Sequence, residues 1–178
     1  MLTRIPYGVL LCVLLLAIGC TPEAEVTSAE GVRPIYANGD ELNIQVEAPR
    51  EYDELSQIVY AHPYILIGEL YQGIHVIDNT VPANPKKLMF IRIPGSTSFT
   101  IGDGVIYSSS GSDLVTIEYD DNTVQERSRI EAYFGGFDAF DQEAPTNYSG
   151  FFECVDLEKG VVIGWVEATL DSPECRTF

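Results

Sequence analysis

The two histidines are the first residues to consider for chemistry, because imidazole serves as a base, a proton carrier and a metal ligand. His62 precedes Pro63 in a predicted turn, and His75 lies in a predicted strand of apolar residues. The chain has no His-x-x-x-His or similar spacing that would direct both rings at one metal ion. We therefore expect ordinary structural roles for both histidines.

Aspartates gather in two segments that have the composition of turns or loops. Asp120 and Asp121 lie in a short turn, whereas Asp138, Asp141 and Glu143 lie in a longer loop. Ca²⁺ takes carboxylate oxygens from such loops, which makes these residues candidate calcium ligands. The spacing of an EF-hand is missing, so solvated turns are the favoured interpretation and no cofactor is expected.

The sequence predicts no catalytic residue. The serine-rich segment 108–112 lacks the Gly-x-Ser-x-Gly form of a nucleophile elbow and is not followed by a helical pattern. No cluster of acid, base and nucleophile occurs elsewhere. We interpret residues 108–112 as part of a hairpin.

The first 19 residues have the pattern of a signal peptide. Arg4 precedes an apolar run over residues 9–18, which is too short to cross a bilayer core of about 30 Å. A charged start followed by a short apolar run is typical of a secretory signal helix. We expect residues 1–19 to be removed on export.

Cys20 is a candidate lipidation site. It follows Leu16-Ala17-Ile18-Gly19, which resembles a bacterial lipoprotein signal except that Ala17 stands where Leu is usual. Thr21, rather than Asp, follows the cysteine, which predicts the outer membrane as the destination. Several acyl chains would anchor the protein to the cell envelope without embedding the fold. An ordinary cleaved signal is the alternative.

Cys154 and Cys175 are predicted to form a disulfide. Oxidised cysteines persist in exported proteins, and the strand predicted over residues 160–166 would bring the flanking segments together. Two unpaired thiols are the alternative, and no other Cys or His lies near enough in the sequence to suggest zinc.

The strong negative charge excludes some partners. The formal net charge is −17, with 27 acidic and 10 basic residues. Nucleic acids and anionic lipid head groups both need cationic neutralisation. We expect no nucleic-acid partner, and membrane contact only through the lipid.

A repeat of 40 residues predicts the architecture. Residues 73–78 match 113–118, and residues 64–68 match 104–108 at the same offset. Short β runs that recur at this period are the mark of a propeller blade. The predicted fold is all-β, with two four-stranded antiparallel blades over residues 57–94 and 95–130.

The remaining segments are assigned by composition. We expect an acidic flexible tether over 20–34, a strand segment over 35–56, and a long loop with a C-terminal hairpin over 131–178. The hairpin would join strands at 151–156 and 161–167. Aromatic residues of the loop could bind a sugar or a protein, although packing over a blade edge is favoured: Tyr133, Phe134, Phe137 and Phe140.

Three segments carry a family resemblance. They are residues 73–79, residues 82–85 (Pro-Ala-Asn-Pro) with 90–95, and residues 159–165, while 113–117 fits the second repeat. Together they resemble the LVIVD-repeat, propeller-like lipoproteins found in Bacteroidota, over about residues 33 to 170. The resemblance implies a propeller-type fold and export as a lipoprotein, but no established activity.

Two blades cannot close a propeller, since closure needs about four. Either the outer segments cover the open blades, or copies associate into a homo-oligomer, or the chain is a fragment. The favoured function is a non-enzymatic, lipid-anchored binding or assembly module with a protein or glycan partner. The alternative is a metal-dependent propeller-type hydrolase or lactonase that is active only as an oligomer.

Overall fold

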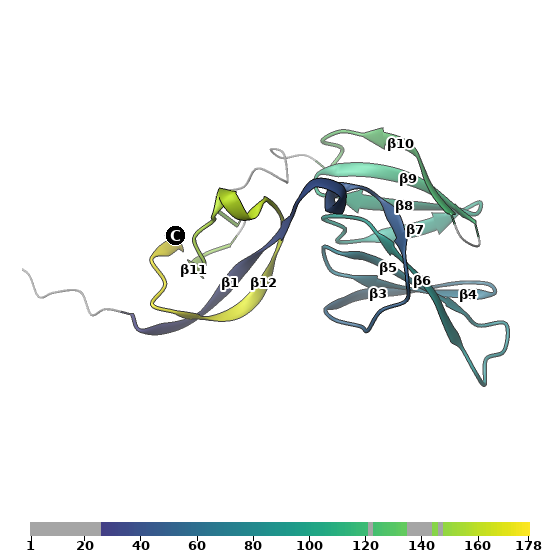
Figure 1. Cartoon of the computed structure of the whole chain (residues 1–178), viewed down its shortest axis with the longest axis horizontal. Helices are drawn as coiled ribbons and strands as arrows, with labels where there is room; N and C mark the ends of the chain where they lie inside the picture. The colour runs from purple at the N-terminus through teal and green to yellow at the C-terminus, as the bar shows by residue number, and fades with distance from the viewer. Residues whose placement is uncertain (1–25, 121–122, 135–143, 146–147) are drawn as a thin grey trace, which may run out of the picture.

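A computed structural model describes residues 26–120, 123–134, 144–145 and 148–178. The described chain is mainly β, and its strands form three sheets with largely antiparallel pairing, as expected for the all-β class (Figure 1). The predicted signal helix and Cys20 lie outside the described residues. Within the described part, no helix is long and apolar enough to cross a membrane.

Sheet I has five strands in the order β2-β6-β5-β4-β3. Its strands are β2 (Gln45–Glu47), β3 (Leu55–Ala61), β4 (Tyr64–Glu69), β5 (Gly73–Asp78) and β6 (Lys86–Arg92). The four strands predicted for residues 57–94 are present as β3, β4, β5 and β6. The fifth strand, β2, comes from the segment 35–56, because Ile44 and Val46 pack against the core.

Sheet II is a four-stranded meander in the order β10-β9-β8-β7. Its strands are β7 (Phe99–Gly102), β8 (Val105–Ser110), β9 (Asp113–Asp120) and β10 (Thr123–Ile130). Four antiparallel strands were the expectation for residues 95–130, and this unit has them. Every connection joins neighbouring strands, so short turns suffice.

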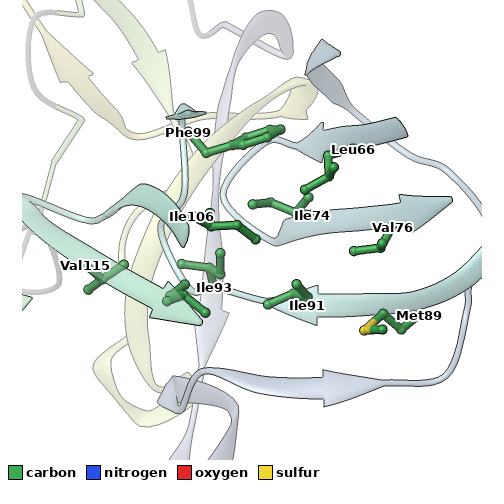
Figure 2. Packing of buried hydrophobic residues seen from close by; sticks show 10 residues of the cluster. Leu66, Ile74, Val76, Met89, Ile91, Ile93, Phe99, Ile106 and Val115 are labelled. Atoms are coloured by element: carbon green, nitrogen blue, oxygen red, sulfur yellow. The ribbon is translucent and has the colours of Figure 1, made fainter. Parts of the chain in front are cut away.

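One hydrophobic core lies between sheets I and II. Figure 2 shows side chains of both sheets meeting there, including Leu66, Ile74 and Ile91 from sheet I and Ile106 and Val115 from sheet II. All five side chains are fully buried. The two repeat units are therefore packed face to face and stabilise each other.

The repeat is shifted by one residue between the two middle strands. Ile74 of β5 faces the core, but its sequence match Leu114 does not, and the core position is taken by Val115. A shift of one residue moves every side chain of a strand to the opposite face. The match of 73–78 with 113–118 is therefore wrong in register. Consequently the outer face of sheet II carries Thr116 where sheet I carries His75.

Sheet III joins the two ends of the described chain in the order β12-β1-β11-β13. Its strands are β1 (Ser28–Ala37), β11 (Gly150–Phe152), β12 (Val161–Asp171) and β13 (Cys175–Thr177). Two short 3-10 helices, η1 (Gly39–Leu42) and η2 (Leu157–Lys159), follow β1 and precede β12. Figure 1 shows this sheet beside sheets I and II, with β1 running towards them.

Two predictions fail in sheet III. Residues 28–34 are not tether but most of β1, because Val32 is buried between neighbouring strands. The predicted C-terminal hairpin is absent, since β1 lies between β11 and β12 and pairs with both. Antiparallel β1–β12 pairing satisfies more backbone groups than a direct pairing with the three-residue β11 could. The N-terminal and C-terminal segments thus depend on each other.

An aromatic ring of the β4–β5 turn packs against sheet III. A side-chain carbon on Gly164 of β12 would lie 2.1 Å from Cγ of Tyr71, so the ring packs on bare backbone. Burial, with the nearby charge of Glu54, raises the pKa of the Tyr71 hydroxyl above its ordinary value. Only glycine permits this approach.

Candidate functional site

A buried polar cluster lies on the outer face of sheet I, the face turned away from sheet II. The β4–β5 pairing sets Glu69 opposite Gly73, which puts Glu69 and His75 on the same face. His75 Nε2 lies 2.6 Å from Glu69 Oε2, and the two residues are only 1% and 3% exposed. Arg50 NH2 forms an ion pair with the other carboxylate oxygen. The three side chains therefore form one network, the Arg50–Glu69–His75 cluster.

A segment between β2 and β3 covers this cluster; we call residues 48–54 the strap. The guanidinium carbon of Arg50 lies 3.8 Å from the centre of the Phe90 ring. Tyr52 packs edge-on against His75 at 4.8 Å between ring centres. Lys87 of β6 donates to the Arg50 carbonyl at 2.9 Å and lies 3.8 Å over the Tyr52 ring. The strap is thus held by ionic and aromatic contacts together.

The chemistry of the cluster is that of a support. A histidine paired with a carboxylate can act as an oriented base only where it reaches a substrate. Here the strap and Phe90 cover both groups, so the carboxylate holds His75 and Arg50 in place. The structural role predicted for His75 agrees with this arrangement, although its partners were not foreseen. The sequence held one signal for these partners, namely an acidic residue, Glu69, at the end of an otherwise apolar strand.

His62 has a separate, exposed environment. Its Nδ1 lies 3.0 Å from the Tyr60 hydroxyl at the end of β3. Within the described ranges, no group of three or more His, Cys, Asp or Glu side chains is arranged to hold a metal ion. The two histidines occupy different surroundings and do not form a common site.

The outer face of sheet I is apolar beyond the strap. Ile58 and Tyr60 of β3 are 69% and 62% exposed. They pair directly with Ile67 and Ile65 of β4, which places all four side chains on this face. We call these four residues the apolar face. Cross-strand neighbours of this kind form one continuous surface.

Of the predicted calcium ligands, only Asp120 lies within the described residues. Asp120 ends β9, while Asp121, Asp138, Asp141 and Glu143 lie outside the described residues. Asp113, at the other end of β9, has a structural role. Burial alone would raise the pKa of Asp113, but bonds from Arg129 and from the Ala132 N–H, at 2.8 and 3.0 Å, hold that pKa below its ordinary value.

Of the loop aromatics, two are described. Tyr133 and Phe134 pack edge-on against each other at 5.1 Å, and Phe134 remains 53% exposed. The favoured prediction that the loop aromatics pack over a blade edge stays a prediction. Their backbone is tied to the β8–β9 turn through a bond from Phe134 N–H to the Ser112 carbonyl. Phe137 and Phe140 lie outside the described residues.

Cys154 and Cys175 form a disulfide in sheet III. Their Cα atoms are 5.3 Å apart, and the bond closes a separation of 21 residues. Cys175 is opposite Phe152 in the β11–β13 pairing, so the bond fastens the short strand β13. A surface groove of about 350 Å³ runs beside it, with Arg33, Leu170 and Glu174 in its wall.

Comparisons of the chain with protein-family models, with curated proteins and with solved structures found no match.

Proposed function

We propose that this chain is a non-enzymatic assembly module of the bacterial cell envelope, anchored through lipid on Cys20. Two copies join through the apolar face of sheet I. The observation that carries the proposal is the exposure of Ile58 and Tyr60, at 69% and 62% on a regular strand. Exposed contiguous apolar surface marks interaction sites.

A propeller-like arrangement of sheets I and II is part of the proposal. The two repeat units stack in the same orientation, since β3 contacts its equivalent β7 at one edge, and β2 contacts β10 at the other. In propellers, consecutive blades stack in this manner around an axis. The arrangement is consistent with the resemblance to LVIVD-repeat lipoproteins. A blade of this type needs cover on both faces, and sheet I has a covering sheet on one.

A second copy is the partner because the two outer faces differ. The outer face of sheet II also carries polar and charged groups, with Thr116 opposite Tyr107 and with Glu118 paired to Arg127. Sheet II of another copy would therefore bury polar groups against the apolar face, which costs free energy. Two apolar faces meeting around a two-fold axis avoid this cost, and such self-complementary contacts are the commonest in oligomers. The four residues of the face carry no charge, which limits repulsion between chains of net charge −17.

The proposal predicts a dimer that a charge on the apolar face disrupts. Ile58→Asp should yield monomers in light scattering, because a carboxylate would be buried in the contact. Val81→Asp is the matched control, since Val81 is 57% exposed but lies in the β5–β6 connection. The control should stay dimeric. A native protein that is monomeric up to millimolar concentration would contradict the proposal.

Lipidation predicts a second result. Cys20→Ser should abolish incorporation of labelled palmitate and leave soluble or unprocessed protein, because the thiol that receives the acyl chain is lost. Cys154→Ser is the control, and it should still incorporate palmitate because Cys154 is bonded to Cys175 and is not the predicted acceptor. Equal labelling of Cys20→Ser would refute the anchor and the outer-membrane location that depends on it.

A further inference from the structure

A polar cavity lies where the strap, η1 and sheet III approach sheet I. Its volume is about 150 Å³, which is room for several waters or for one small organic group. Tyr36, Glu41, Arg50, Gln72 and Arg92 supply its polar wall, and Ile163 of β12 contributes an apolar side. Residues far apart in the sequence therefore line one partly open cavity.

Each arginine of the cavity is held by an ion pair with a glutamate. Arg50 is paired with Glu69 and stacks on Phe90 at 3.8 Å. Arg92 of β6 is paired with Glu47 of β2. Each ion pair uses one terminal nitrogen, and a guanidinium carries five N–H groups. Further donors on each arginine thus remain for a ligand, and little side-chain entropy is left to lose on binding.

The wall has more donors than acceptors. Glu41 already accepts a bond from the Asn38 N–H at 2.9 Å, which occupies one of its oxygens. The backbone of Gln72 is bonded to Glu69 and Ile93, which fixes its position in the wall. A ligand that matches two arginine forks must be planar and rich in acceptors. A carboxylate has this geometry, because it accepts two parallel bonds from one guanidinium.

Charge distinguishes a carboxylate from a phosphate. Glu41, Glu47 and Glu69 surround the two arginines, so the local charge is close to neutral or slightly negative. The whole chain adds a repulsive field, with its net charge of −17. The local glutamates and the net charge of the chain both repel a dianion such as phosphate, and they repel a monoanion less strongly. The apolar side at Ile163 suits a short hydrocarbon stem beside the charged group.

We infer that this cavity binds the carboxylate group of a small monoanionic organic acid, held between Arg50 and Arg92. The site is separate from the apolar face of sheet I and does not depend on dimer formation. In this site, Glu69 of the Arg50–Glu69–His75 cluster would orient Arg50 towards the ligand.

The test is an NMR titration of the ¹⁵N-labelled protein with three probes: propionate, its neutral isostere propionamide, and inorganic phosphate. Propionate should shift the amide signals of Gln72 and Ile163 in a saturable manner, in the millimolar range expected for so few atoms. Propionamide should give no saturable shift, and phosphate should bind at least tenfold more weakly than propionate. Equal shifts with propionamide, or tighter binding of phosphate, would overturn the assignment.

Substitutions locate the site within the same experiment. Arg92→Gln should weaken propionate binding at least tenfold, and Arg92→Lys should weaken it less because the charge is kept. Arg33→Gln is the matched control, since Arg33 is paired with Glu153 in sheet III, and it should bind like the native protein. Undiminished binding by a folded Arg92→Gln protein would refute the site. If that variant does not fold, Arg92→Lys and the three probes on the native protein still decide the result.

Discussion

Glu69→Ala is expected to lower the free energy of unfolding by about 3–5 kcal/mol, because it removes one member of a buried charged network. The carboxylate is 3% exposed and contacts both His75 and Arg50. Without it, His75 keeps a buried polar edge with no acceptor, and Arg50 loses the group that holds the strap. Urea unfolding followed by far-ultraviolet circular dichroism measures the loss.

An exposed ion pair supplies the control for this substitution. Glu118 pairs with Arg127 on sheet II, where the side chains are 47% and 48% exposed. Glu118→Ala should cost less than about 1 kcal/mol, because water screens the charges and solvates the arginine. Glu69→Gln should fall between the two, since the amide oxygen still accepts a bond. Equal small losses for Glu69→Ala and Glu118→Ala would contradict the supporting role of the cluster.

Loss of the disulfide is expected to lower the stability of sheet III by about 3 kcal/mol, which is the entropy released when a loop of this length opens. The bond closes a 21-residue separation, and β13 is otherwise held by three residue pairs with β11. Cys154→Ala with Cys175→Ala tests this without leaving a free thiol. The expected change is concentrated in sheet III, because the bond fastens β13, a strand of that sheet.

Trp165 makes this localisation measurable. It is the only tryptophan of the chain and packs edge-on against Phe152 in sheet III, at 5.7 Å between ring centres. Its fluorescence transition in urea should move to lower urea concentration in the double variant. The circular dichroism transition, dominated by sheets I and II, should move less. Coincident and unchanged transitions would show that the bond adds nothing to the fold.

The candidate sites could be predicted from the sequence only in part. The pairing of Cys154 with Cys175 followed from their number and from the predicted export, and the bond is present. The cavity arginines, Arg50 and Arg92, had no spacing that related them to each other or to Glu69. They converge because β2 joins β6 at the edge of sheet I, a contact between segments about 45 residues apart. Spacing along the chain carries no signal for such a contact.

Local patterns alone determined the hairpins of sheets I and II. The short β runs recognised at residues 64–68 and 73–78 coincide with β4 and β5, because apolar runs and the turns that bound them are signals between neighbouring residues. The position of β1 between β11 and β12 depends instead on backbone pairing across more than 110 residues. The one-residue register shift between Ile74 and Leu114 depends on which side chains reach the shared core. For the position of β1 and for the register of β9, several strand pairings fit the local sequence pattern equally well. Only the contacts buried in the folded chain favour the observed pairing over the others.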